Sequence, residues 1–281
     1  MNQHLILYED KKRLFLKDAK DWIVFSLLNT DAAIEGGSGN EFFRLGAGND
    51  LVIGWGGNDI VYAGSGDDEI IAWDSDVKEY TGGNVEFHGE DGNDTLVGWK
   101  GNDILNGGEG NDIIIAKEGD DTIYTGNGND KVTAGIGNDK IFIQGVGQKE
   151  IYGGPGSDTF IIEPSDIKEI GRYIIGDFDI SDKSEKIDFS QMSPLIKSLE
   201  EKYLGVFDHM ATIDPSICNN DIADNSNNLL ICKENAEKKV ASVSMCWTLG
   251  PGTDDHYRCV TLVGVTKDQI MHSPENFVFA D

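Results

Sequence analysis

The sequence predicts an all-β fold, a two-faced β-solenoid of parallel strands, and three observations indicate it. Aspartates recur at every ninth position over much of the chain, with a glycine two positions before each and a β-branched or aliphatic residue two positions after. Glycine contributes 35 of the 281 residues, whereas proline contributes only 6. A fixed short period is typical of a repeat architecture, and a glycine surplus of this kind indicates many tight turns.

The repeat extends over residues 36–162 and has one interruption. Its aspartates are Asp50, Asp59, Asp68, Asp94, Asp103, Asp112, Asp121, Asp130, Asp139 and Asp158. The glycines two positions before them are Gly48, Gly57, Gly66, Gly92, Gly101, Gly110, Gly119, Gly128, Gly137 and Gly156. A weak first copy carries Glu41 in place of the aspartate. The stretch from 72 to 88 has lost the pattern, and its length equals two units less one residue.

Each unit is predicted to contain one turn and one short strand. The last three residues should point outward, inward and outward, because side chains alternate along a strand. The residues before them are rich in Gly, Asn and Asp, which suits a turn with positive φ. Since one unit buries a single side chain, units must stack to be stable. We expect successive strands to lie in opposite faces, so that equivalent residues meet in every second unit.

Several outward positions are apolar and should gather on the two faces. One face is predicted to carry Leu51, Ile53, Ile71, Val97, Ile113 and Ile115. The other is predicted to carry Ile60, Tyr62, Ile104, Tyr124 and Phe142. We expect the terminal segments or a second chain to cover much of at least one face, because apolar patches of this size are rarely left in water.

The repeat region is strongly acidic. It holds fifteen Asp and eight Glu against seven Lys or Arg, a net charge of −16, and the whole chain carries −27. Such a charge excludes nucleic-acid and membrane-surface binding. Stacked carboxylates repel one another, and a hard divalent cation between coils would resolve this repulsion. Calcium fits better than magnesium because turn carbonyls suit a larger, irregular shell, and no repeating thiolate or imidazole favours zinc or copper.

One stretch carries the unit Gly-Gly-x-Gly-x-Asp-x-apolar-x in full, namely Gly107-Gly108-Glu109-Gly110-Asn111-Asp112-Ile113-Ile114-Ile115. This unit resembles the calcium-binding nonapeptide of the repeats-in-toxin (RTX) family. The resemblance implies a parallel β-roll in which several calcium ions lie between turns that are two units apart. It also implies that each ion is bound by aspartate carboxylates and by carbonyls of the turn glycines, Gly108 included.

The resemblance further implies which aspartates form pairs. The pairs are Asp50 with Asp68, Asp94 with Asp112, Asp103 with Asp121, Asp112 with Asp130, Asp121 with Asp139, and Asp139 with Asp158. Glu41 is a poorer partner for Asp59, which is expected to lose its downstream partner where the pattern fails near Val77.

The flanks are predicted to cap the repeat. Residues 1–35 suggest three strands, at 4–8, 13–16 and 21–25, that cover the open end of the coil. Residues 163–281 are expected to form a mainly β capping region with one short helix from Ser193-Pro194 to about Tyr203.

The C-terminal region also resembles parts of exported RTX proteins. Residues 173–179 and 185–190 are similar to the segment that closes many RTX arrays, and residues 260–265 and 276–279 to the tails of type I-secreted proteins. The N-terminal segment is too charged for a signal peptide, and no apolar run reaches the length of a membrane span. The resemblance therefore implies a secreted or cell-surface protein that engages the type I secretion machinery.

Four cysteines lie in this same region, where RTX proteins usually have few. They are Cys218, Cys232, Cys246 and Cys259, and no two of them lie close enough in the sequence to match a zinc motif. Two hairpins favour the pairs 218–232 and 246–259, and four buried thiols remain the alternative.

No catalytic motif is found, so we expect that the chain is not an enzyme. Its five histidines are scattered, and nucleophile elbows and phosphate loops are missing. Two function classes remain. One is a calcium-binding folding and export module, the C-terminal part of a secreted toxin, adhesin or exoenzyme. The alternative is a calcium-stabilised module that binds a carbohydrate or a protein, for which Trp55 and Trp73 would stack as an aromatic row.

Overall fold

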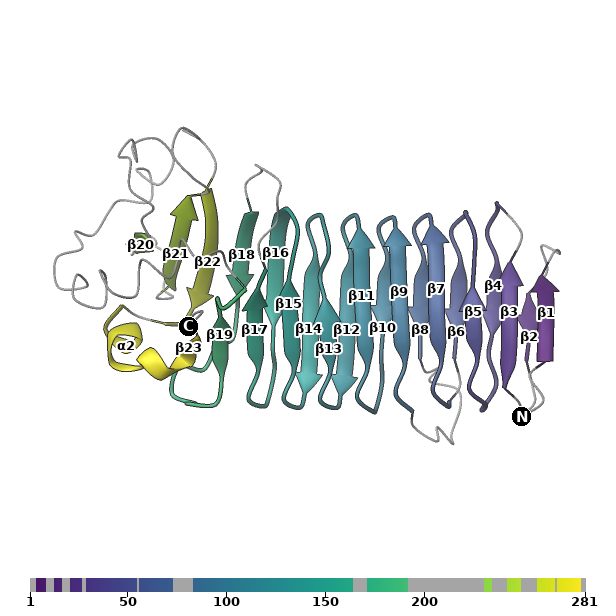
Figure 1. Ribbon diagram of the computed structural model, residues 1–281, viewed down its shortest axis with the longest axis horizontal. Coiled ribbons are helices and arrows are strands. Elements are labelled where there is room, and N and C mark those ends of the chain that lie inside the picture. The colour runs from purple at the N-terminus through teal and green to yellow at the C-terminus, as the bar shows by residue number, and fades with distance from the viewer. Residues whose placement is uncertain are drawn as a thin grey trace.

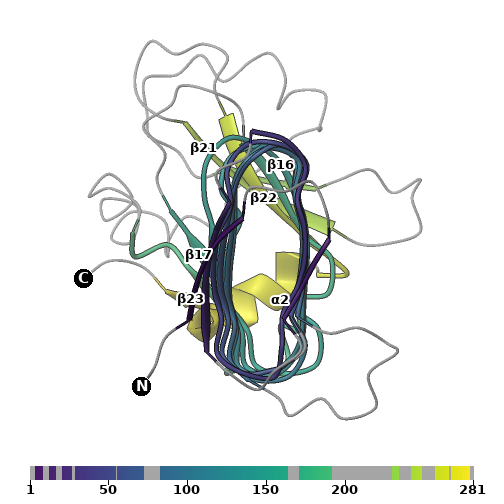
Figure 2. The same ribbon diagram turned by 90° about the vertical axis from the view of Figure 1, so that its right-hand side faces the viewer.

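The computed structural model describes residues 4–8, 13–16, 21–26, 29–54, 56–72, 83–163, 171–191, 230–233, 242–248, 257–265 and 267–278. The chain winds into an elongated solenoid whose coils follow one another along the long axis (Figure 1). Seen along this axis, the coils superpose as a flattened oval, with strands on the two long sides and turns at the two narrow ends (Figure 2). The predicted all-β parallel β-roll is confirmed.

The strands alternate between two sheets, so successive strands lie in opposite faces as predicted. The 11-stranded sheet contains β1 (His4–Tyr8), β3 (Trp22–Ser26), β5 (Phe42–Arg44), β7 (Ile60–Ser65), β9 (Glu86–Asp91), β11 (Ile104–Glu109), β13 (Thr122–Tyr124), β15 (Lys140–Ile143), β17 (Thr159–Ile162), β19 (Lys186–Asp188) and β23 (Phe277–Val278). The 12-stranded sheet contains β2 (Leu14–Phe15), β4 (Ala33–Glu35), β6 (Leu51–Ile53), β8 (Glu69–Ile71), β10 (Thr95–Val97), β12 (Ile113–Glu118), β14 (Lys131–Ile136), β16 (Gly147–Tyr152), β18 (Gly171–Ile175), β22 (Tyr257–Val263), β21 (Ser242–Thr248) and β20 (Leu230–Lys233).

Neighbouring coils are offset by two units over most of the repeat, as Leu96 beside Ile114 illustrates. The offset grows between β8 and β10, where Ile70 pairs with Leu96, and between β7 and β9. Hydrogen bonds between coils accordingly join positions 18 apart on most steps and 26 apart on this one. The stretch 72–88 is therefore not two shortened units, as its length suggested. It contains the fourth to ninth positions of one regular unit, residues 83–88, preceded by an insertion, because only an insertion lengthens both steps equally.

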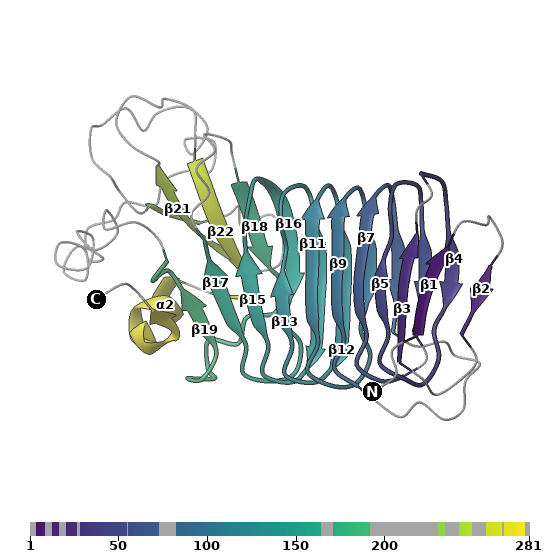
Figure 3. The same ribbon diagram turned by 45° about the vertical axis from the view of Figure 1, so that its right-hand side comes forward.

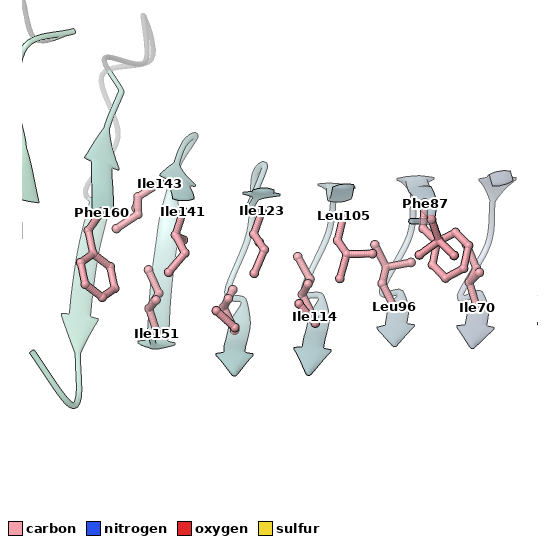
Figure 4. Close-up of a cluster of buried hydrophobic side chains, with 14 of the residues drawn as sticks. Ile70, Phe87, Leu96, Leu105, Ile114, Ile123, Ile141, Ile143, Ile151 and Phe160 are labelled. Carbon is pink, nitrogen blue, oxygen red and sulfur yellow. The ribbon is translucent and has the colours of Figure 1, made fainter. Parts of the chain in front are cut away.

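One or two inward side chains per strand of the repeat build the core, and these side chains form two facing stacks (Figure 4). Ile70, Leu96 and Ile114 come from the 12-stranded sheet, and Phe87 and Leu105 come from the other; all five are 1% exposed or less. Truncating such a side chain typically lowers the free energy of unfolding by about 2–5 kcal/mol. The core of each coil is thin, but each side chain in it therefore contributes strongly to stability.

The outward apolar residues divide between the faces as predicted, because their strands belong to the expected sheets. Several of them are exposed: Ile104 by 39% and Ile113 by 43% of their surface. Whether a terminal segment or a second chain covers either face stays a prediction.

The flanking segments continue the solenoid. At the N-terminal end β1 pairs with β3 and β2 with β4, all parallel, so these strands form further coils (Figure 3). At the other end β18 and β19 extend the two sheets, and the hairpin of β21 and β22 adds an antiparallel margin. A short helix, α2 (Lys267–His272), and a 3-10 turn, η2 (Pro274–Asn276), also lie there.

Two predictions about the C-terminal region meet the structure only in part. The helix expected over 193–203 lies outside the described residues, and α2 was not expected from the sequence. The register of β21 and β22 places Cys246 directly opposite Cys259, as the second predicted hairpin requires. Cys218 lies outside the described residues, so the first pair stays a prediction. No helix in the described ranges is both long enough and apolar enough to span a membrane.

Candidate metal sites

The predicted acids occupy the sixth position of their units, in the turn that immediately precedes a strand. Because the turns lie at the two narrow ends of the oval (Figure 2), the acids form two rows, one at each end. The row before the strands of the 12-stranded sheet, here called the Asp50 row, contains Asp50, Asp68, Asp94, Asp112 and Asp130. The row before the strands of the other sheet, the Asp59 row, contains Glu41, Asp59, Asp103, Asp121, Asp139 and Asp158. All eleven side chains are buried, with 4% exposure or less.

Within a row, one carboxylate oxygen links each acid to the coil before it. The backbone N–H of Asp94 donates to Asp112 Oδ1 at 2.9 Å, and that of Asp103 donates to Asp121 Oδ1 at 2.7 Å. The same hydrogen bond joins Asp50 to Asp68, Asp112 to Asp130, Asp121 to Asp139, Asp139 to Asp158 and Glu41 to Asp59. The structure therefore brings together the residues of every predicted pair.

One further pair was not predicted from the sequence. The N–H of Asp68 donates to Asp94 Oδ1 at 2.8 Å, although the two residues are 26 positions apart. A search in steps of two units cannot find this pair, because the insertion lies between its members. In the Asp59 row the place one coil after Asp59 is taken by Val85, whose N–H donates to Asp103 Oδ1. Asp59 thus loses its downstream acid as predicted, but at Val85 and not near Val77.

The second carboxylate oxygen is buried and has no hydrogen-bond partner in Asp68, Asp94, Asp112, Asp121 and Asp139. An acceptor left unpaired in the interior costs about 1–3 kcal/mol, and more when it is charged. In Asp112 this Oδ2 atom lies only 2.3 Å from where a Cβ on Gly107, the first residue of its own unit, would be. Glycine at that place therefore keeps open a space next to the unpaired oxygen.

The glycines predicted as ligands shape the turns that stack above one another. All of them have positive φ, between 91° and 150°. A Cβ on Gly128, for example, would lie 1.8 Å from the carbonyl oxygen of Gly110 in the preceding coil. Only glycine allows this approach, and it brings the turn carbonyls of successive coils close to the buried carboxylates.

A cationic side chain marks the place where these oxygens converge. The Nζ atom of Lys149 donates to the carbonyl oxygens of Gly126 and Gly128, both at 2.8 Å, and to Asp130 Oδ2 at 2.5 Å. The carbonyls belong to the second and fourth positions of the unit, and the carboxylate to the sixth. This lysine was not predicted as a site residue, although the unit 144–152 reads x-Gly-x-Gly-x-Lys-x-Ile-x, with Lys149 in the place of aspartate.

Burial alters the acid–base behaviour of both rows. It raises the pKa of Asp112 and Asp121 to about 7 and that of Asp94 to about 6, because a charged carboxylate is poorly solvated in the turn. The effect is largest for Asp59, whose pKa is raised to about 9 by burial and by the charge of Glu41. Without a cation, these groups would hold protons near neutral pH, so the rows are poised to bind positive charge.

The donor set fits calcium. In the part of the chain that the structure describes, no three acidic, histidine or cysteine side chains converge as a metal cluster. The acids instead follow one another singly along each row, so a cation must take carbonyl oxygens as its other ligands. A shell of carboxylate and carbonyl oxygens on glycine turns suits a hard cation of variable geometry, which calcium is.

A comparison with protein families agrees with this geometry. The sequence model of the RTX calcium-binding nonapeptide repeat (4 copies) matches residues 35–70, 81–105 and 106–141. These segments include both rows from Glu41 to Asp139, whereas Asp158 lies beyond them. No curated protein matches the chain.

Proposed function

We propose, from the premise that residues 35–141 carry RTX calcium-binding nonapeptide repeats, that calcium is the ligand whose binding folds this β-roll. The observation that carries the proposal is the series of buried Oδ2 atoms without partners. Five such oxygens recur at equivalent places, and glycine keeps open a space beside those of Asp94 and Asp112. A calcium ion at each step would supply the missing partner and would neutralise the acids.

The same ions would supply the free energy that the thin core lacks. Ordering the backbone costs about 1–2 kcal/mol per residue, and each coil adds only a few inward side chains. The ligands converge only when coils stack, so the free energy of calcium binding becomes free energy of folding. Because acids of neighbouring coils contact each other along each row, except at Val85, folding should be steep in calcium concentration.

This coupling suits a chain that crosses a membrane unfolded. In a cytosol with little calcium the repeats would stay open, and in millimolar extracellular calcium they would fold. We therefore place the chain outside the cell or on its surface, exported by a type I system as part of a toxin, adhesin or exoenzyme. RTX repeats are typical of such proteins. The proposal assigns a folding role to the chain and no catalytic step.

Circular dichroism of the full chain tests this function. In excess chelator we expect the β signal to be largely lost, and titration with calcium should restore it over a narrow concentration range. Magnesium at the same concentration serves as the control and should restore far less, because it demands a smaller octahedral shell. A chelated chain that keeps its full β signal and melting temperature would disprove the proposal.

A second function, recognition of a carbohydrate or a protein, is supported by aromatic rings on the outer face of the 11-stranded sheet. Tyr62 and His88 stack at 4.4 Å, and Tyr124 and Phe142 at 4.6 Å between ring centroids. Trp55 and Trp73 lie outside the described residues, so the expected tryptophan row stays a prediction. Calcium-dependent retention on an immobilised glycan, weakened by Tyr62→Ala, would support this function; equal retention of both chains would count against it.

A further inference from the structure

Lys149 stands in the Asp50 row at the place of an aspartate. Its neighbour Glu150 pairs with Lys131, so Lys149 lies one coil after Asp130 in the same register. The side chain is completely buried, with 0% of its surface exposed. A lysine is almost never buried in this way unless its charge is matched, so its surroundings must compensate for lost hydration.

The contacts of the ammonium group provide that compensation. Its three donor positions meet three oxygens, the carbonyls of Gly126 and Gly128 and Oδ2 of Asp130. These are the second-, fourth- and sixth-position oxygens of one unit. Oδ2 of Asp112, one coil earlier, has no partner, whereas that of Asp130 has the lysine.

The next residue in the row continues this change. Tyr173 pairs directly with Lys149 between β16 and β18 and is also completely buried. Its hydroxyl donates to the carbonyl oxygen of Gly145 at 3.0 Å, again a second-position carbonyl of the preceding coil. Two successive side chains thus reach back to oxygens that are equivalent to those in the acidic coils.

We propose that Lys149 replaces a calcium ion in this solenoid, an inference that rests on the proposed function. The ammonium group occupies the step between Asp130 and the following coil, and Tyr173 takes over one carbonyl at the step after it. The Asp50 row therefore binds calcium only as far as the step between Asp112 and Asp130. A cation that approached Gly126 and Gly128 would find their oxygens occupied and would be repelled by the ammonium charge.

A consequence is that the two ends of the repeat differ in their need for calcium. On the Asp50 row, the coils from residue 125 onward are joined by covalently attached donors that are present at any calcium concentration. The coils before Asp112 have no such donor among the described residues of this row, and they keep unpaired oxygens at Asp68 and Asp94.

The number of bound ions tests the replacement. Lys149→Asp restores the aspartate of the repeat, and calorimetric titration of the full chain should then show one calcium ion more than the unchanged chain. Lys131→Asp is the matched control, since this exposed residue has the same charge change but faces outward on β14. The control should bind the original number of ions.

The outcomes separate the two proposals. If the unchanged chain binds no calcium, the proposed function fails. If it binds calcium and a folded Lys149→Asp chain binds the same number, Lys149 does not replace an ion, while the proposed function stands.

A second variant covers the case in which Lys149→Asp does not fold. Lys149→Met keeps the length of the side chain but removes the charge and the donors. In saturating calcium we expect its ion count to be unchanged and the backbone amides of residues 144–152 to exchange at least about tenfold faster, since hydrogen bonds to charged groups are lost. Unchanged exchange in a folded Lys149→Met chain would overturn the inference.

Discussion

The two rows of acids are built from the same repeat, yet they differ in where they are broken and how they end. The Asp50 row runs without interruption through five aspartates, because the hydrogen bond from Asp68 to Asp94 crosses the insertion. The next position of this row, one coil after Asp130, is occupied by Lys149. The Asp59 row is broken at Val85 and resumes at Asp103. It ends in another acid, since Glu185 lies one coil after Asp158.

This difference shows that the sixth position fixes the chemistry of a step but not the fold of the coil. Aspartate, valine, lysine and glutamate all occupy it, and strand pairing continues past each of them. The backbone N–H of Val85 even makes the same bond to the next acid as an aspartate does. The fold thus depends on the glycine turns and the inward apolar residue, while the sixth residue decides whether a step needs a cation.

The largest expected effect acts on both rows at once and depends on pH. With chelator present, burial raises the pKa of the acids to about 6 or 7, above the value of about 4 for an unfolded chain. The folded state then binds more protons, so its stability is greatest below pH 4 and falls as pH rises from 4 to 7. We expect a chelated chain to regain part of its β signal and a measurable thermal transition at pH 5, whereas at pH 7.5 it stays largely unfolded.

The same measurement in saturating calcium is the control and should give the opposite trend, because protons compete with the ions. Asp59 should contribute most to the change in chelator, since its pKa of about 9 keeps it protonated in the folded chain over this range while it ionises in the unfolded chain. A chelated chain that becomes more stable toward pH 7.5 would contradict the burial of these carboxylates in an ion-free fold.

The second effect compares one acid from each row. Asp112 has acids on both sides, whereas Asp59 has Glu41 on one side and Val85 on the other. Asp112→Ala should remove two calcium ions and lower the free energy of unfolding by about 5 kcal/mol, since each ion contributes about 2.7 kcal/mol at 100 times its Kd. Asp59→Ala should remove at most one ion. Equal losses in calorimetry and urea unfolding would refute the difference between the rows.

A third, smaller effect would repair the broken row. Val85→Asp places an acid between Asp59 and Asp103 and completes the step to each of them, so the chain should bind two additional calcium ions. Unfolding in saturating calcium should then require about 3 kcal/mol more, because the loss of the buried valine side chain offsets part of the gain from the ions, whereas in chelator the variant should be less stable than the unchanged chain. Val85→Asn has nearly the same shape without the charge and is the control. If both variants bind equal numbers of ions, Val85 is not what breaks the row.

The smallest effect concerns backbone strain and should be alike in the two rows. Glu90 and Lys117 occupy the second position of their units with φ of 73° and 91°, a region where glycine is favoured. Glu90 lies in the unit of Asp94, which belongs to the Asp50 row, and Lys117 lies in the unit of Asp121, which belongs to the Asp59 row. The substitutions Glu90→Gly and Lys117→Gly therefore test one turn from each row. Each should raise the free energy of unfolding by about 0.5–1 kcal/mol in thermal or urea unfolding. Lys131→Gly, on an extended strand, should lower it by a similar amount.

Most of the fold follows from the sequence because its period is visible in single residues. The spacing of Asp94, Asp103 and Asp112 gives the coil length, and the alternation around Ile114 gives the inward side. The flanking coils could not be foreseen in the same way. Strands β1 to β4 lack the glycine and aspartate signature, so that only the pairing of their backbones reveals them as coils.

The candidate sites were predictable where the motif is intact and not where it changes. Every predicted aspartate pair is brought together by the coil register, since two units make one coil. The pair of Asp68 and Asp94 was hidden by the insertion, whose length the motif does not encode. Lys149 was not predicted for a different reason. The motif indicates the acidic ligands of a cation, whereas the ammonium group of Lys149 takes the place of the cation itself.

The short step between coils has a consequence for the speed of folding. From β5 to β17, each strand pairs with one that lies only two or three units away in a long chain. Most all-β folds join distant segments and fold slowly, but here the mean sequence separation of contacts relative to length is about 0.1 or less, as in helical bundles. During folding, the end of a partly formed solenoid therefore needs only the next two units of the chain to add a coil. Distant segments of the chain do not have to be brought together first.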